Sequence, residues 1–109
     1  MDTSKNDIVR DIKNYVYELN KNGISVQKVV LFGSWARGQV RENSDIDVAL
    51  ISDSFSGDGF QDRRKIVPLR RKINTKIESI PFNQESFSMG GNLVDWIMRY
   101  GEEITLNFY

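Results

Sequence analysis

The sequence predicts an α/β (α+β) fold, a single domain over residues 1–109 in which helices flank a small mixed β-sheet. Three observations support this prediction. Apolar residues near the N-terminus recur at helical spacing, two apolar runs further along have the length and composition of strands, and the second run is apolar on both faces. A strand that is apolar on both faces belongs to a sheet that is covered on both sides. A chain of 109 residues is long enough to bury one such core.

The first predicted element is a helix over residues 4–22. Ser4 can cap this helix, and Asp7 lies in its first turn, near the positive end of the helix dipole. Gly23 is the expected stop. One apolar stripe at helical spacing faces the core and consists of Ile8, Ile12, Tyr15, Val16 and Leu19.

Two central strands are expected, over residues 25–32 and 45–51, with a loop of short polar and small residues between Gly33 and Ser44. Side chains alternate along a strand, so Asp45 and Asp47 share one face. Ala49 and Ile51 continue that face, while the opposite face is formed by Ile46, Val48 and Leu50.

The next part of the chain predicts a loop over residues 52–60, a helix from about 60 to 74 and a strand over 76–80 that Pro81 ends. Pro68 lies inside the helix and should kink, split or delay it. The helix also carries a run of basic residues, which most often forms a solvated face: Arg63, Arg64, Lys65, Arg70, Arg71 and Lys72.

The C-terminal part predicts a loop over residues 82–91 and a last helix that Asn92 caps and Gly101 ends. The apolar residues of that helix are Leu93, Val94, Ile97 and Met98. Ile104, Leu106 and Phe108 alternate with polar residues, which predicts a terminal strand or an ordered tail.

Composition excludes several kinds of chemistry. Fifteen basic and fifteen acidic residues give zero net charge, which argues against a nucleic-acid ligand. The absence of cysteine and histidine excludes thiolate chemistry, the usual zinc sites and the Ser-His-Asp triad. No apolar run approaches the ~20 residues of a membrane span, and the polar N-terminus has no signal-peptide core. We therefore expect a cytoplasmic protein that does not bind a membrane.

The two polar clusters at the predicted strand ends suit a nucleoside triphosphate. Gly33 lets the backbone approach phosphate, and the Ser34 hydroxyl can donate to phosphate oxygens. Asp45 and Asp47 can bridge two Mg²⁺ ions, which in such sites lie roughly 3.5–4 Å apart. Glu78, on the next strand, is the candidate for a third carboxylate. Arg37 could reach a phosphate through its bidentate fork.

These residues carry a resemblance. The run from Phe32 through Gly38 (Phe-Gly-Ser-Trp-Ala-Arg-Gly), followed by Ser-Asp-Ile-Asp at 44–47, resembles the motif of the polymerase-beta-like nucleotidyltransferases. More narrowly, it is similar to the minimal nucleotidyltransferases, short bacterial and archaeal proteins. The resemblance implies the polymerase-beta-like palm fold, with the triphosphate held at Gly33 and Ser34. Asp45 and Asp47 then match the magnesium-binding catalytic pair, and Glu78 matches a third acid that is often Asp in the family.

The same resemblance implies a function. Members transfer a nucleoside monophosphate, here AMP from ATP, onto an acceptor hydroxyl and release pyrophosphate. Many minimal members resemble antitoxins that bind and adenylylate a helical HEPN-type toxin, and others are grouped with the aminoglycoside nucleotidyltransferases. The residues leave two further readings open, a non-catalytic nucleotide-binding regulator and a two-metal nuclease. The sequence leaves homo-oligomerisation open.

The short chain bears on where the acceptor binds. The motif strands and covering helices leave little sequence for an acceptor pocket, so we expect a partner protein to supply or complete it. Aromatic residues near the C-terminus, Trp96, Tyr100, Phe108 and Tyr109, are candidates for that contact, although Trp96 equally suits core packing. Trp35 could stack on a base or a partner, or be tucked under its loop.

Overall fold

A four-stranded mixed sheet forms the centre of the fold. The computed structural model describes residues 4–40 and 44–106. Its strands are β1 (Lys28–Phe32), β2 (Ile46–Ile51), β3 (Ile77–Phe82) and β4 (Glu102–Ile104), in the spatial order β3-β2-β1-β4. Strand β1 pairs antiparallel with both β2 and β4, whereas β2 and β3 are parallel. The predicted mixed sheet is confirmed.

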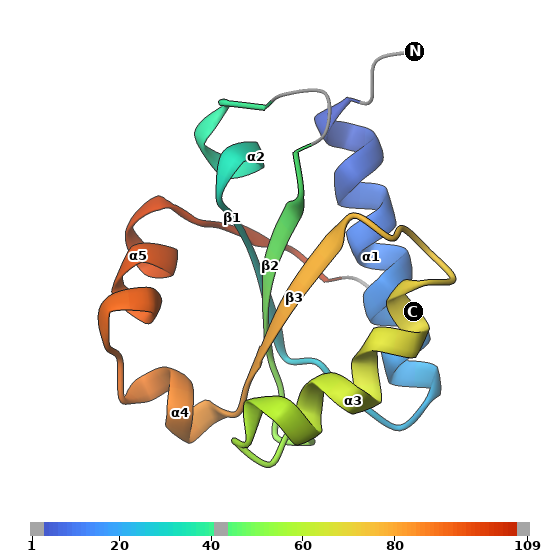
Figure 1. The fold of residues 1–109 in the computed structure, drawn as a ribbon, viewed down its shortest axis with the longest axis vertical. Helices are drawn as coiled ribbons and strands as arrows, with labels where there is room; N and C mark the ends of the chain where they lie inside the picture. Colours follow the sequence, from blue (N-terminus) through green and yellow to red (C-terminus); the bar gives the residue numbers. More distant parts are fainter. Residues whose placement is uncertain (1–3, 41–43, 107–109) are drawn as a thin grey trace.

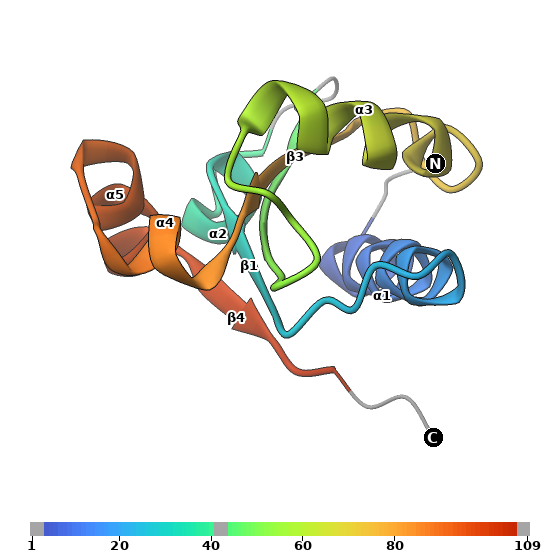
Figure 2. The same ribbon diagram turned by 90° about the horizontal axis from the view of Figure 1, so that it is seen from below.

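Helices cover both faces of this sheet (Figures 1 and 2). Helices α1 (Lys5–Lys21) and α3 (Gly59–Arg70) lie on one face, and α4 (Gln84–Ser88) and α5 (Asn92–Tyr100) lie on the other. The predicted alternation along β2 is confirmed, because its two sets of side chains enter different cores. Ile46, Val48 and Leu50 join the core under α1 and α3, and Ala49 and Ile51 join the core under α5. None of the helices in the described ranges is both long and apolar enough to cross a membrane.

Helix α1 forms as the sequence predicts. The Ser4 side chain accepts a hydrogen bond from the backbone N–H of Asp7, and the Asp7 carboxylate accepts one from the backbone of Ser4. The buried hydroxyl of Tyr15 lies 3.0 Å from the Ser79 hydroxyl on β3 and 3.4 Å from the Ile66 carbonyl on α3. Burial raises the pKa of Tyr15 to about 12. The tyrosine therefore stays neutral and joins α1 to both neighbouring elements.

The basic helix is shorter than predicted. Helix α3 runs through Pro68 and ends at Arg70, and a turn follows where the sequence predicts helix up to residue 74. A proline inside a helix removes one backbone hydrogen bond and its ring crowds the carbonyl four residues earlier, and α3 ends two residues after Pro68. Most of the basic run is exposed, as expected for a solvated face, but Arg70 is largely buried.

The prediction that Pro81 ends its strand is wrong, because β3 continues to Phe82. The carbonyls of Lys76 and Phe82 accept hydrogen bonds from the N–H groups of Ile46 and Ser52. The backbone N–H and C=O groups of the even-numbered β3 residues therefore point toward β2. Those of the odd-numbered residues point away from the sheet, and so does the Pro81 nitrogen. Strand β3 is an edge strand, so a missing N–H on its outer side removes no ladder hydrogen bond.

The predicted loops are also too long. Residues 82–91 contain α4, which begins because the Asn83 side chain accepts from the backbone N–H of Ser86 while the Ser86 hydroxyl binds the backbone of Asn83. Gly91, rather than Asn92, is the N-cap of α5. The terminal strand is confirmed as β4, but it ends at Ile104. The predictions for Phe108 and Tyr109 lie outside the described residues.

Candidate functional site

The end of β1 and the start of β2 form the centre of the site. Phe32, the last residue of β1, is paired with Asp47 on β2. Gly33 follows with φ 72° and ψ −148°, a backbone conformation that is almost restricted to glycine. A Cβ atom on Gly33 would overlap the carboxylate of Asp47. Glycine is therefore required twice here, for its backbone conformation and for the close approach of the turn to the carboxylate.

The residues after this turn form a helix where the sequence predicts a loop. Helix α2 (Ser34–Arg37) is a single turn that ends at Gly38, which has a left-handed conformation. Ser34, a candidate phosphate contact, is its first residue and is half-buried. The helix lies against both β1 and β2, so it holds Ser34 next to the start of β2.

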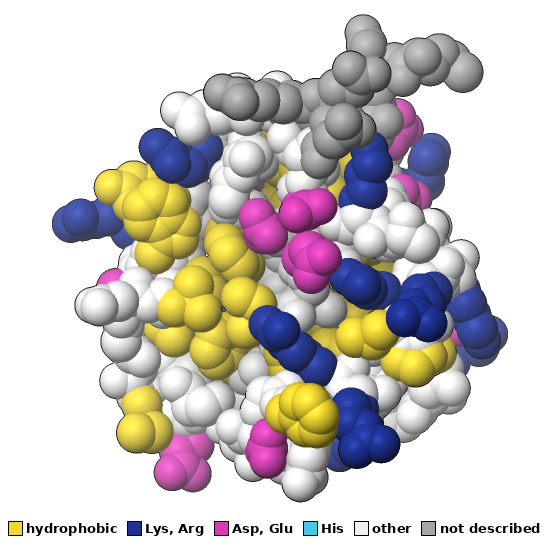
Figure 3. All heavy atoms as spheres, in the orientation of Figure 1, with side chains coloured by type: hydrophobic (Ala, Val, Ile, Leu, Met, Phe, Trp, Pro, Cys, Tyr) yellow, Lys and Arg dark blue, Asp and Glu magenta, His cyan; other side chains and the backbone are white. Residues whose placement is uncertain are grey.

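The three candidate carboxylates gather at one end of the sheet. Asp47 pairs with Glu78 in the parallel register of β2 and β3, so their side chains lie side by side on the same face. Asp45 precedes Asp47 by two residues and is exposed. Figure 3 shows acidic side chains clustered over the upper ends of β2 and β3. The sequence predicted these residues, and the strand pairing brings them together.

Electrostatics support this proximity. Burial raises the pKa of Asp47 above its ordinary value, and the neighbouring carboxylates of Asp45 and Glu78 raise it further. The negative charge of Asp47 is thus held at an unfavourable position in the folded chain. Such positions are common in functional sites, where a cation or a substrate compensates the charge.

The chemistry of the three carboxylates fits Mg²⁺, which prefers oxygen ligands and is commonly bound through one or two carboxylates together with substrate phosphates. Across residues 4–40 and 44–106, no group of three or more Asp, Glu, His or Cys side chains is already arranged so that it could hold a metal ion. The donor atoms are therefore of the right kind, whereas a complete protein-only ligand shell is not preformed.

Arg70 is a site residue that the sequence did not single out. Its Nη1 atom donates to the Ile77 carbonyl at 2.6 Å and lies 3.4 Å from Oε1 of Glu78. Its Nε atom is buried and has no hydrogen-bond partner. Asp62 and Ile66, which are buried, precede Arg70 by eight and four residues, so Arg70 lies on the same inner face of α3. This four-residue spacing is the sequence signal that distinguishes Arg70 from the rest of the basic run.

Arg37, the candidate phosphate contact, lies against α5. Its guanidinium carbon lies 5.2 Å from the centre of the Trp96 ring and 5.7 Å from that of Tyr100, so it stacks on α5. Trp35 packs against the core under α1, and its indole N–H is buried without a partner. Trp35 is therefore partly buried under its loop, as the second of the two alternatives for this residue predicts.

This arrangement defines a class of protein. A mixed sheet holds a glycine-serine turn against an Asp-x-Asp strand, with a glutamate on the next strand, which is the arrangement that the resemblance to the polymerase-beta-like nucleotidyltransferases implies. Residues 9–91 match the family model described as the nucleotidyltransferase domain, and the chain belongs to this family. The resemblance stated from the sequence is confirmed.

Individual relatives agree with this assignment. Over 100 residues the chain is 24% identical to "Putative protein adenylyltransferase MJ0141" of Methanocaldococcus jannaschii, an alignment that covers 90% of this chain and 96% of that protein. The crystal structure of a putative nucleotidyltransferase from Sulfolobus solfataricus has a TM-score of 0.66 at 17% identity, covering 91% of this chain and 80% of that one. A crystal structure of a toxin-antitoxin with AMP-PNP has a TM-score of 0.61 at 18% identity, covering 87% and 73%. At these identities the two structures establish the fold.

Replacement of Gly33 tests the contact with Asp47. Gly33 and Gly38 both have φ 72°, but only a Cβ on Gly33 meets other atoms. We expect Gly38→Ala to lower the free energy of unfolding by about 1 kcal/mol through backbone strain alone. Gly33→Ala should cost about 1–3 kcal/mol and should also displace the Asp47 carboxylate. Urea denaturation of both variants measures the difference, and equal costs would contradict the close contact.

Replacement of Asp47 tests the unfavourable charge. A carboxyl group with a raised folded-state pKa stabilises the fold at low pH, and that contribution is lost as pH rises through the raised pKa. We therefore expect Asp47→Asn to raise Tm at neutral pH in EDTA and to weaken the loss of Tm that the wild type shows as pH rises above the ordinary pKa of an aspartate. Added Mg²⁺ should raise the Tm of the wild type and not that of the variant. A lower Tm for Asp47→Asn in EDTA would mean that the carboxylate makes a stabilising contact instead.

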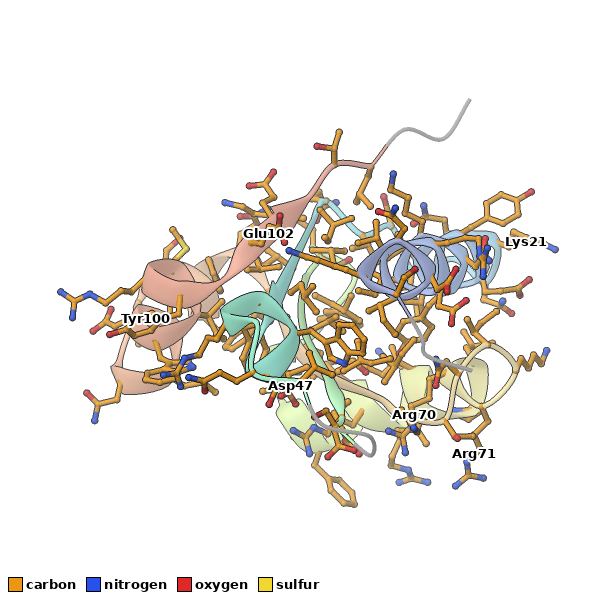
Figure 4. All side chains as sticks on the ribbon, turned by 90° about the horizontal axis from the view of Figure 1, so that it is seen from above. Lys21, Asp47, Arg70, Arg71, Tyr100 and Glu102 are labelled. Atoms are coloured by element: carbon orange, nitrogen blue, oxygen red, sulfur yellow. The ribbon has the colours of Figure 1, made fainter. Side chains whose placement is uncertain are left out.

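Replacement of Arg70 tests its contact with β3. Arg70→Gln removes a charged donor from the Ile77 carbonyl and should lower the free energy of unfolding by about 1–2 kcal/mol. Arg71 is the matched control, because it is the next residue along and is exposed to solvent (Figure 4). Arg71→Gln should change stability by less than about 0.5 kcal/mol. Similar urea midpoints for the two variants would show that Arg70 is only a surface charge.

Proposed function

We propose that this nucleotidyltransferase uses Mg²⁺ to transfer AMP from ATP onto a hydroxyl group of a partner protein, as an antitoxin of the HEPN/minimal-nucleotidyltransferase type. The observation that carries the proposal is the contact between the Gly33 turn and the Asp47 carboxylate. A triphosphate bound at that turn would have its phosphates next to the carboxylates, which are oxygen donors of the kind that would hold Mg²⁺.

The reaction needs few protein groups. The acceptor oxygen forms a bond to the α-phosphorus of ATP, the bond from that phosphorus to the bridging oxygen breaks, and pyrophosphate leaves with that oxygen. Gly33 and Ser34 bind the triphosphate through the backbone and a hydroxyl. Asp45, Asp47 and Glu78 would hold Mg²⁺, which neutralises phosphate charge and favours the deprotonated acceptor oxygen when bound. The acceptor proton passes to water or to a carboxylate of the cluster.

A protein acceptor is supported by two observations. The family match and the covering helices account for most of the chain, so the described residues include no separate acceptor-binding domain. The M. jannaschii relative is named as a protein adenylyltransferase, and a toxin-antitoxin is among the structures with the same fold. We extend both properties to this chain as part of the proposal.

The test compares two labels. The protein is incubated with Mg²⁺ and ATP labelled at either the α- or the γ-phosphate, in an extract of the cells that naturally produce it. We expect label from the α-phosphate to appear on protein and the γ-phosphate to appear in pyrophosphate. EDTA and the Asp45→Asn/Asp47→Asn double variant should each abolish the transfer.

Three outcomes would contradict the proposal. Protein labelling by the γ-phosphate would indicate a kinase, and labelling that persists in the double variant would exclude catalysis by these carboxylates. Binding of ATP without any transfer would favour the non-catalytic regulator.

Calorimetric titration with ATP, GTP, CTP and UTP, in parallel, identifies the donor nucleotide, and preference for another nucleotide would overturn the choice of ATP.

A further inference from the structure

We propose that Trp96 and Tyr100 on α5, with Arg37, form the platform on which the nucleobase of the donor nucleotide stacks. This inference rests on the proposed function, and it assigns a base-binding role to residues outside the nucleotidyltransferase motif strands. We call these three residues the α5 platform. Its support comes from its position, its exposed aromatic surface and the lack of a competing surface near the site.

The position of the platform follows from the pairing of β1 with β4. Leu31 on β1 is paired with Glu102 on β4 in an antiparallel register. Gly101, which joins Tyr100 at the end of α5 to β4, lies beside Val30 and Leu31 near the end of β1. Gly101 makes the close approach possible, because a Cβ there would collide with atoms of β1 and α5. The platform therefore lies at the same end of β1 as the candidate phosphate turn.

The platform offers aromatic surface to solvent. Trp96 is 39% exposed and Tyr100 is 43% exposed, although large aromatic side chains are usually well covered. Their ring centres are 4.6 Å apart, with the ring planes tilted by 53°. The Arg37 guanidinium, on α2, lies over both rings. Rings and a guanidinium plane that are held in place can stack a base without ordering new side chains, and such stacking tolerates any base.

Other aromatic residues in the described ranges are poor alternatives. Trp35 is packed against the core, as described above. Phe82 and Phe87 pack edge to face on each other, with ring centres 5.3 Å apart, against the core under α5. Phe60 is exposed, but α3 begins at the end of the sheet that is remote from the acidic cluster (Figure 1). The α5 platform is the exposed aromatic surface next to the site.

The test separates the base from the phosphates. Binding of ATP and of inorganic tripolyphosphate is measured by calorimetry in the presence of Mg²⁺. Tripolyphosphate carries the phosphates without a base, so we expect Trp96→Leu and Tyr100→Leu each to weaken ATP binding about tenfold and to leave tripolyphosphate binding unchanged. Trp96→Phe keeps a flat ring and should restore most of the affinity for ATP.

The matched control is Tyr17 on α1. It is also an exposed tyrosine with a cation over its ring, because Nζ of Lys21 lies 5.6 Å from the ring centre. Lys21 and Tyr100 lie at opposite sides of the molecule in Figure 4. Tyr17→Leu should therefore leave the binding of both ligands unchanged. The chain has two tryptophans, so in a Trp35→Phe background the fluorescence of Trp96 should change with ATP and not with tripolyphosphate.

The outcomes distinguish the two proposals. If ATP binds and Trp96→Leu does not weaken it, or weakens tripolyphosphate binding equally, the α5 platform is excluded as the base site while the proposed function stands. That result would leave the exposed face of α5 to a partner protein. If the wild type binds neither ATP nor tripolyphosphate, both proposals are overturned.

Discussion

The site depends on the fixed register of β2 between β1 and β3. Asp47 has Phe32 on one side and Glu78 on the other, and a slip of one residue would turn its carboxylate to the opposite face of the sheet. Ile46 and Val48, on either side of Asp47, are fully buried in the core under α1 and α3. Their burial sets the register, so the hydrophobic effect determines where the carboxylates lie.

This register gathers like charges at one end of the sheet. The pKa of Asp47 is raised by burial and by two neighbouring carboxylates, which means that its charged form opposes folding at neutral pH. Arg70 offsets part of this charge from the outer edge of β3, where it contacts both Ile77 and Glu78. Proteins commonly retain such unfavourable groups where a ligand needs them. The carboxylate cluster is therefore better explained by function than by stability.

The covering helices do more than close the two cores. Helix α3 supplies Arg70 to one side of the acidic cluster, and α5 supplies the two rings on which Arg37 stacks. A chain with no net charge thus separates its charges locally, with the acidic groups gathered at one end of the sheet, Arg70 beside Glu78 and Arg37 against α5. Net charge indicated little about the ligand, because recognition at such a site depends on local charge.

The sequence by itself determined the longer helices, the central strands and the central motif. Hydrophobic periodicity was sufficient for α1 and for the two faces of β2, because side-chain direction follows directly from the helical and strand repeats. Local residue type was sufficient for the Gly33-Ser34 turn and for the Asp pair. Short capped segments such as α2 and α4 were missed, because their few residues carry no periodic pattern.

Tertiary structure decided everything that depends on which strands are neighbours. Pro81 could remain within β3 only because β3 is an edge strand and the backbone nitrogens of its odd-numbered residues point away from β2. The partners of Arg37 and Arg70 depend on the packing of α5 and α3, which no local pattern encodes. The sequence determined that Asp45 and Asp47 share one face, since spacing along one strand is local. Only the fold determined which groups meet, since those contacts join residues far apart in the chain.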